Sequence, residues 1–193
     1  MLQEKLKGKH LILGSGSPRR RYFLEELGLD FEIRLKSVEE SYPESLRGAE
    51  ISDYLARLKA VPFLDELVEN DILVTADTIV WRFDHALGKP RDQEEARKML
   101  RDLSCEEHEV ISSVALTTCE DQFVLNETTR VKFKCLREEE IEFYTGKYKP
   151  FDKAGAYGIQ EWIGLIGIEW IVGSYFNVMG FPVRKFYEKL LEI

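Results

Sequence analysis

The sequence predicts a mixed protein, α/β to α+β in class, in which helices flank a single elongated mixed β-sheet. Three observations lead to this class. Short apolar runs typical of buried strands alternate with segments of helical periodicity, and two neighbouring runs resemble a strand pair. The chain has 193 residues, of which 44% are hydrophobic, enough for one domain or for one domain with two lobes.

The first elements are defined by their end signals. A strand rich in aliphatic residues ends in glycine and serine, and a helix follows. Ser17 suits the N-cap of this helix, Pro18 its first turn and Gly28 its end. A later helix is expected to break at Pro62. The predicted strands and helices before residue 70 are, in order, residues 9–15, 17–28, 31–35 and 48–68.

The later elements follow the same signals. Asp92 and Glu95 form a capping box at the start of a helix. Val131, Phe133 and Cys135 alternate with lysines, as in a strand with one buried face. The predicted elements are a strand at 71–81, a helix at 89–104, paired strands at 108–119 and 123–136, a helix at 138–148, a glycine-spaced β or loop segment at 156–175, and a helix at 182–193.

The charge and cysteine content narrow the class of protein. Lys and Arg number 27 against 35 Asp and Glu, a net charge of −8, which argues against general nucleic-acid or membrane binding. The three cysteines are too widely spaced for a metal or redox pair, so we expect reduced thiols in a cytoplasmic protein. No signal peptide is indicated, and no apolar run approaches the about 20 residues of a membrane helix.

Three consecutive arginines, 19–21, stand where the first long helix begins. A helix N-terminus after a glycine-serine loop offers free backbone N–H groups and a positive dipole end. Hydroxyl groups from Ser15 and Ser17, with the guanidinium groups of Arg19 and Arg20, would complete a phosphate cradle. The alternative is that the arginines are solvated residues of the first turn.

Asp77 interrupts a strand that otherwise reads as buried on both faces. A buried carboxylate needs a cation, a metal or hydrogen-bond donors. Lys89, in a tight Gly-Lys-Pro loop, would return beside Asp77 through a hairpin or short crossover. Glu39 and Glu40 lie in a polar stretch that could supply a further metal ligand or could simply be surface acids. Magnesium favours one or two carboxylates plus phosphate oxygens. A buried structural ion pair, or a strand that ends at Ala76, would also explain Asp77.

The segment "DKAGAYGIQ" at 152–160 is a further candidate. Small residues let the backbone approach a ligand closely. Lys153 could reach a phosphate, and the amide of Gln160 could pair with a base edge. A tight glycine-rich turn is the alternative. His108 is expected to be structural, because no histidine has metal-ligand spacing with another.

Four motifs occur together in one order: S-x-S-P-R-R, A-D-T, G-K-P and K-A-G-x-Y-x-I-Q. With the segments around them, they resemble the Maf (septum-formation) family of nucleotide pyrophosphatases over nearly the whole chain. The resemblance implies a single Maf/ITPase-like domain over residues 1–193, with two lobes and a cleft between them. It also implies a homodimer and house-cleaning hydrolysis of nucleoside triphosphates to monophosphate and pyrophosphate, with magnesium or manganese.

The resemblance also assigns roles. Asp77 is implied as the proton acceptor, and Lys59 and Lys89 as catalytic lysines. Glu40 best matches the acid expected near the metal, with Asp77 as the other ligand. Substrate-binding positions fall on Ser15, Ser17, Arg19, Arg20, Thr78, Lys153 and Gln160. Among these, Arg19, Thr78 and Gln160 mark the subgroup that prefers dTTP and UTP.

The chain departs from the family pattern at two positions. Cys105 and Glu161 stand where the family usually has glycine. Glu161 adds a negative charge near the predicted base pocket, which bears on substrate preference. Alternatives to a dTTP/UTP pyrophosphatase are a nucleotide-binding regulator of division with little turnover, a 7-methyl-GTP-type pyrophosphatase, and a phosphatase that releases orthophosphate.

Overall fold

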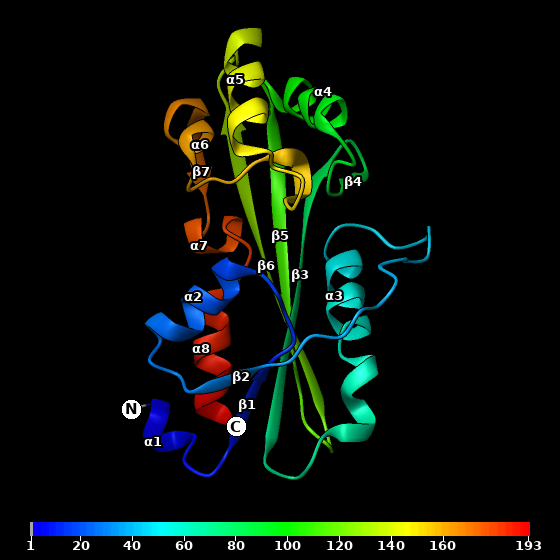
Figure 1. Cartoon of the computed structure of the whole chain (residues 1–193), viewed down its shortest axis with the longest axis vertical. Helices are drawn as coiled ribbons and strands as arrows, with labels where there is room; N and C mark the ends of the chain where they lie inside the picture. The colour runs from blue at the N-terminus through cyan, green and yellow to red at the C-terminus, as the bar shows by residue number, and fades with distance from the viewer. Residues whose placement is uncertain (1) are drawn as a thin grey trace. The chain divides into compact units, whose positions relative to one another are not determined.

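The computed structural model describes residues 2–193 and has the predicted mixed α/β class (Figure 1). The chain divides into two compact units. Unit 1 comprises Met1–Asp77, Ser112–Glu127 and Gly180–Ile193, and unit 2 comprises Thr78–Ile111 and Thr128–Met179.

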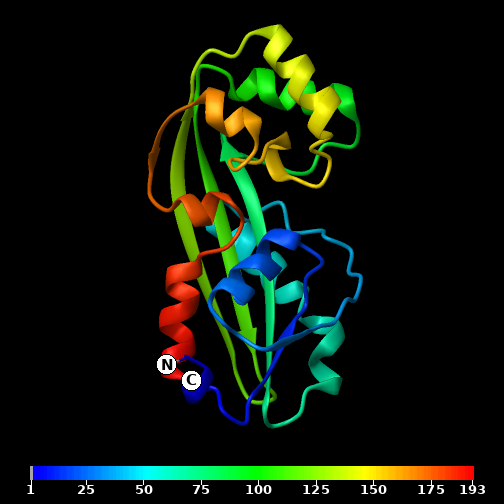
Figure 2. The same cartoon turned by 60° about the vertical axis from the view of Figure 1, so that its left-hand side comes forward.

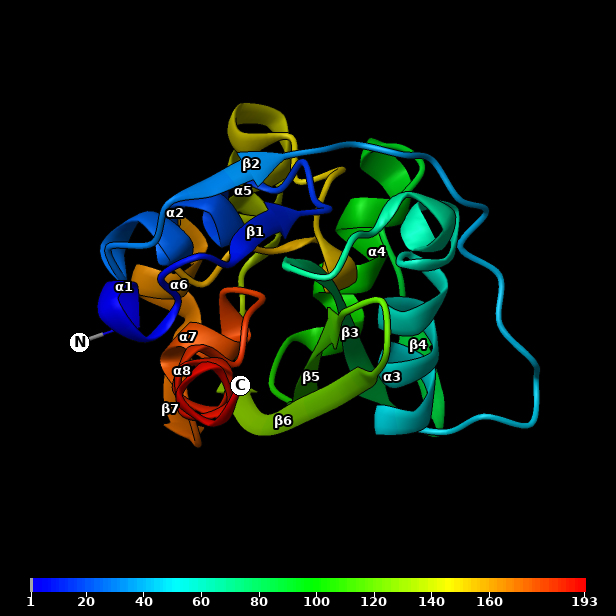
Figure 3. The ribbon, with the colours of Figure 1, turned by 90° about the horizontal axis from the view of Figure 1, so that it is seen from below.

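The strands form one mixed sheet, as predicted. Its order is β2-β1-β3-β5-β6-β7, and β4 pairs with β3. β1 runs parallel to β2 and to β3, and the two strands β1 and β2 lie side by side in Figure 3. β4 is antiparallel to β3, and β7 is antiparallel to β6. The bounds are β1 (His10–Leu13), β2 (Phe31–Ile33), β3 (Asp71–Arg82), β4 (His85–Leu87), β5 (Glu107–Thr117), β6 (Gln122–Phe133) and β7 (Ile168–Val172).

The register of β3 fixes where its polar residues fall. In unit 1, Leu73 pairs with Ile12 and Val74 with Leu13 of β1, and all four side chains are buried. Asp77 lies three residues further along the same strand. β3, β5 and β6 each begin in one unit and end in the other.

Unit 1 packs its helices around aromatic and aliphatic side chains. The ring of Phe181 lies 6.2 Å from that of Phe23 and 4.9 Å from that of Phe186, which connects α2 to α8. α1 contacts α8 and lies beside it in Figure 2. The expected break at Pro62 is confirmed, because an α-helix gives way to a 3-10 helix there. The helices are α1 (Leu2–Lys5), α2 (Pro18–Glu26), α3 (Ala49–Leu58), η1 (Val61–Glu66) and α8 (Val183–Glu192).

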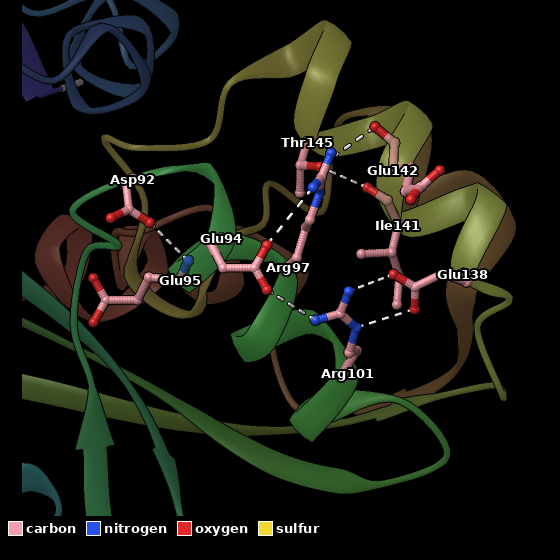
Figure 4. A network of polar contacts seen from close by, with 9 residues as sticks. All are labelled: Asp92, Glu94, Glu95, Arg97, Arg101, Glu138, Ile141, Glu142 and Thr145. Atoms are coloured by element: carbon pink, nitrogen blue, oxygen red, sulfur yellow. Dashed lines mark hydrogen bonds and ion pairs between the residues drawn. The ribbon is translucent and has the colours of Figure 1, made fainter.

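Unit 2 has its own apolar core, where Leu100 of α4 packs with Phe133 of β6 and other buried residues. Half of the predicted capping box of α4 is confirmed, since the Asp92 carboxylate accepts a hydrogen bond from the backbone N–H of Glu95 at 2.9 Å. The Glu95 carboxylate accepts from the backbone N–H of Arg91 at 2.7 Å instead of from that of Asp92. Arg101 of α4 bonds Glu138 of α5 (Figure 4). The helices are α4 (Gln93–Leu103), α5 (Glu138–Tyr148), η2 (Ala154–Ala156), α6 (Trp162–Gly167) and α7 (Tyr175–Val178). No helix among residues 2–193 is long and apolar enough to cross a membrane.

The glycine-spaced segment at 156–175 was expected to be β or loop, and part of that prediction is wrong. Residues Trp162–Gly167 form α6, and only Ile168–Val172 form a strand. A Cβ at Gly164 would lie 1.8 Å from the backbone oxygen of Ile159. The glycine therefore lets the helix backbone pack directly on the preceding loop.

The prediction of three reduced thiols is also wrong. A disulfide joins Cys105 to Cys135, while Cys119 is free and exposed. The backbone N–H of Cys105 bonds the carbonyl oxygen of Lys134 at 3.0 Å, which holds the turn after α4 against the chain that follows β6. Cys135 is exposed, beyond the end of β6, so the buried alternation predicted for it stops at Phe133.

Candidate active site

At the start of α2, Arg20 and Arg21 have different partners. Ser17 is the N-cap residue, as predicted, but its side chain makes no capping bond. The hydroxyl of Ser15 accepts hydrogen bonds from the Ser17 backbone N–H at 3.3 Å and from Arg20 Nη1 at 3.2 Å. Arg20 Nε bonds the carbonyl oxygen of Gly180 at 3.2 Å, whereas Arg21 pairs with exposed Glu25 at 2.7 Å. One arginine is thus fixed beside the Ser15 hydroxyl.

Asp77 occupies a buried position within β3, with 6% of its surface exposed. Its carboxylate accepts a hydrogen bond from Lys59 Nζ at 2.6 Å. The same ammonium lies 3.2 Å from Glu40. Lys59 is positioned because it is the C-cap residue of α3, where the helix ends. The strand continues to Arg82, so the alternative that it ends at Ala76 is wrong.

Burial dominates the electrostatics at this point. It raises the pKa of Asp77 above its ordinary value, although the positive charges of Lys59 and Arg20 oppose the rise. Burial likewise lowers the pKa of Arg20, against the attraction of Asp77 and Glu40. These four residues of unit 1, with Ser15, are called the Asp77 cluster below. The cluster contains two cations and two carboxylates, so its formal charge is zero. A phosphate bound there would therefore need a further cation, or hydrogen-bond donors directed at its oxygens.

The cluster supplies two carboxylates for a divalent cation, and a bound ligand would have to supply further oxygens. Glu40, from the loop after β2, and Asp77, from β3, approach the same ammonium, so their carboxylates lie close together. Within residues 2–193, no group of three or more His, Cys, Asp or Glu side chains is arranged to hold a metal. Two carboxylates completed by phosphate oxygens are a donor set that magnesium accepts.

Thr78 and Lys89 belong to unit 2, where Thr78 lies in β3 and Lys89 follows the β3–β4 hairpin. Val80 of β3 pairs with Leu87 of β4, and Arg82 pairs with His85. Lys89 follows two residues after the end of β4, and the carbonyl oxygen of Gly88 before it accepts a hydrogen bond from the backbone N–H of Gly155 at 3.1 Å. The hairpin expected from the sequence is therefore present.

The loop at 152–160 differs from the expectation for a phosphate ligand. Lys153 is buried, and its ammonium contacts the carboxylates of Asp152 at 2.7 Å and Glu161 at 3.2 Å. Gln160, in contrast, is exposed. The reasoning from sequence missed Tyr144 as the other partner of Glu161, because nothing in the pattern of α5 distinguishes that tyrosine from a core residue.

His108 has the structural role predicted for it. It is buried in unit 2, and its Nε2 lies 2.8 Å from the hydroxyl oxygen of Tyr157. Burial and the positive charge of Arg82 lower the pKa of His108 to about 3. The imidazole is therefore neutral near pH 7.

A buried strand carboxylate held by a lysine, together with an arginine at a helix N-terminus, is an arrangement typical of α/β proteins that bind anionic ligands. The sequence profile of the Maf-like protein family matches residues 10–193, and the chain belongs to this family.

Curated relatives are similar over almost their full length. A protein of Flavobacterium psychrophilum is 53% identical over 191 residues, 99% of this chain and 98% of the relative. One of Flavobacterium johnsoniae is 54% identical over 190 residues, 98% of each chain. One of Parabacteroides distasonis is 49% identical over 188 residues, 97% of each chain. All three are named dTTP/UTP pyrophosphatase.

Proposed function

We propose that this protein is a nucleoside triphosphate pyrophosphatase that hydrolyses dTTP and UTP to the monophosphate and pyrophosphate. The observation that carries the proposal is the buried Asp77 carboxylate, 2.6 Å from Lys59 and beside Arg20. The names of the relatives supply the substrate class. A protein that only bound nucleotide would have no use for a buried proton acceptor.

In this mechanism, Asp77 accepts a proton from the attacking water. The water oxygen bonds to phosphorus as the bond between the α-phosphorus and the bridging oxygen breaks, and pyrophosphate leaves. Lys59 keeps the carboxylate oriented and offsets charge that develops on the phosphate. Arg20, Ser15 and the backbone N–H groups at the start of α2 bind phosphate oxygens.

Glu40 and Asp77 would hold a magnesium or manganese ion together with substrate oxygens. Such an ion, when bound, lowers the pKa of water and neutralises phosphate charge. The carboxylate of Glu40, 3.2 Å from Lys59, is partly exposed and so remains accessible to a ligand.

The remaining predicted substrate contacts stay part of the proposal on the basis of the family resemblance. They are Ser17, Arg19, Thr78 and Gln160, and Lys89 stays in the proposal as a catalytic lysine. Arg19, Thr78 and Gln160 would favour a pyrimidine base. Lys153, which the resemblance also implies as a substrate contact, is left out of this set because the carboxylates of Asp152 and Glu161 already neutralise its ammonium.

The central experiment measures products. Purified protein with dTTP and magnesium should release pyrophosphate and TMP, and orthophosphate release would indicate a phosphatase instead. Asp77→Asn should lower kcat by about a thousandfold, the range of general-base catalysis, with the thermal unfolding midpoint preserved. Asp84→Asn is the matched control, because Asp84 lies in the β3–β4 turn at φ 60, which asparagine also adopts readily.

Other outcomes of this experiment would favour the alternative functions. Tight dTTP binding without turnover would support a regulator, and preferential hydrolysis of 7-methyl-GTP would support the other subgroup. Full activity of Asp77→Asn would remove Asp77 as the proton acceptor.

We also propose that residues 1–193 act as one domain and that the protein forms a homodimer. β3, β5 and β6 each contribute residues to both units, which supports one domain. Unit 2 exposes apolar side chains along β7 and its neighbours, which supports an interface with a second copy. These side chains are Leu165, Trp170, Val172, Tyr175 and Phe176. Sedimentation velocity tests this, and a monomer at all concentrations would refute it.

A further inference from the structure

Glu161 stands where the family usually has glycine, and its side chain does not cap the helix that begins after it. It is the N-cap residue of α6, with φ −93° and ψ 177°, yet its carboxylate makes no capping hydrogen bond. It turns instead to two residues of unit 2, the ammonium of Lys153 and the hydroxyl of Tyr144. A local capping role therefore does not explain this residue.

Lys153 is the first of these partners. Its side chain is 9% exposed, and its ammonium lies 2.7 Å from Asp152 and 3.2 Å from Glu161. A buried ammonium costs several kcal/mol unless carboxylates or other acceptors compensate it. Two carboxylates of the chain already neutralise Lys153, so little positive charge remains for a phosphate.

Tyr144 is the second partner, and it is fully buried in α5. Its hydroxyl donates a hydrogen bond to Glu161 and accepts one from the backbone N–H of Gly158 at 3.0 Å. Burial and the bond to Glu161 raise the pKa of Tyr144, so the hydroxyl stays protonated and remains a donor. One carboxylate thus connects α5 to the backbone of the loop.

The loop backbone packs directly on these side chains. A Cβ on Gly158 would lie 2.9 Å from the Glu161 carboxyl carbon and 3.1 Å from Lys153 Cε. Ile159 is buried, whereas Gln160 is exposed between it and Glu161. The backbone is therefore held on both sides of Gln160, whose own side chain faces outward.

We propose that Glu161 is a positioning residue for substrate selection: with Lys153 and Tyr144 it forms a clamp that fixes the loop presenting Gln160 to the nucleotide base. Lys153 then serves the loop and not the phosphates. This inference rests on the proposed function, in which Gln160 contacts the base. It predicts that the clamp affects binding of the nucleoside part of a ligand and leaves binding of the phosphate chain unchanged.

The experiment compares two ligands in the full-length protein: dTTP as substrate, and inorganic tripolyphosphate, which has no base, as competitive inhibitor. Glu161→Ala removes both clamp contacts, Glu161→Gln keeps an oxygen for Tyr144, and Tyr144→Phe keeps the ion pair with Lys153. Glu169→Ala is the control, because Glu169 is an exposed acid nearby in sequence.

Glu161→Ala should raise KM for dTTP about tenfold, the equivalent of one lost hydrogen bond, with kcat nearly unchanged. The inhibition constant of tripolyphosphate should not change. Glu161→Gln should recover only part of the loss, because it keeps an acceptor for Tyr144 but not the charge that compensates Lys153. Glu169→Ala should match wild type. If Glu161→Ala does not fold, Tyr144→Phe decides, with a raised KM for dTTP expected and an unchanged one refuting the clamp.

Two results would overturn the inference. One is an unchanged KM for dTTP in folded Glu161→Ala. The other is a loss of tripolyphosphate affinity equal to that of dTTP, which would place Lys153 and Glu161 in phosphate binding. Absence of dTTP turnover in the wild-type protein would refute the proposed function itself, and so is distinguishable from both.

Discussion

Removal of the disulfide between Cys105 and Cys135 should destabilise the protein by an amount that follows from its position in the chain. The two cysteines are 30 residues apart. A crosslink that closes a loop of that length reduces the entropy of the unfolded chain enough to stabilise the fold by about 3.7 kcal/mol. Each kcal/mol corresponds to about 2–4 °C in a chain of this size, so Tm should fall by about 7–15 °C.

The assay is urea unfolding of wild type, Cys105→Ser, Cys135→Ser and the double variant. Both cysteines are exposed, so serine creates no buried cavity. The two single variants and the double variant should lose the same free energy of unfolding, because each breaks one shared bond. With a thiol reductant, wild type should approach the variants. Cys119→Ser is the control, since Cys119 is already free.

Two results would refute this reasoning. Titration of the unfolded protein without reductant should find one thiol, and three, the full cysteine content, would mean that no bond forms. Additive losses in the double variant would mean that the cysteines act through separate contacts.

Two further predictions follow from the geometry. Gly164→Ala should destabilise the protein by about 3 kcal/mol or more in urea unfolding, because its Cβ would lie 1.8 Å from the Ile159 oxygen. Gly146→Ala should instead stabilise it by about 0.5–1 kcal/mol, because the added Cβ, within α5, meets nothing closer than 3.7 Å. Lys59→Met removes the main cation that opposes the raised pKa of Asp77, so this pKa should rise further. The rate requires ionised Asp77, so the acidic limb of the kcat/KM profile should move to higher pH, and an unmoved limb would contradict the assignment.

Most of the fold could be predicted from local signals. The cap at Asp92, the break at Pro62 and the periodicity of α4 depend on neighbouring residues, which the sequence displays. α6 could not be predicted, because Gly164 there reflects a contact with the backbone of Ile159 and not a turn. The disulfide between Cys105 and Cys135 could not be predicted for a similar reason, because it depends on backbone hydrogen bonds between segments that are distant in sequence.

The candidate site was predictable where a residue violated its local pattern. Asp77 is anomalous in a buried strand, and that anomaly predicts a compensating partner. The partner in the structure is Lys59 at the end of α3, which only the family resemblance singled out, because nothing local connects it to β3. Glu161 departs from the glycine usual in the family, which the sequence shows. The direction of its side chain could not be inferred, because its partners lie in α5 and in the loop that precedes Glu161. The structure turns that carboxylate toward Lys153, where it compensates a buried charge.

The pairing of β3 with β1 in unit 1 has a consequence for how this chain can evolve. Successive side chains of a strand point to opposite faces, so the alignment of Val74 with Leu13 also decides the direction of Asp77. One residue inserted or deleted between Val74 and Asp77 would turn the acid away from Lys59 and bring a neighbour into its place. Sequence length in this short stretch should therefore be invariant, even where the identity of the intervening residues is free to drift.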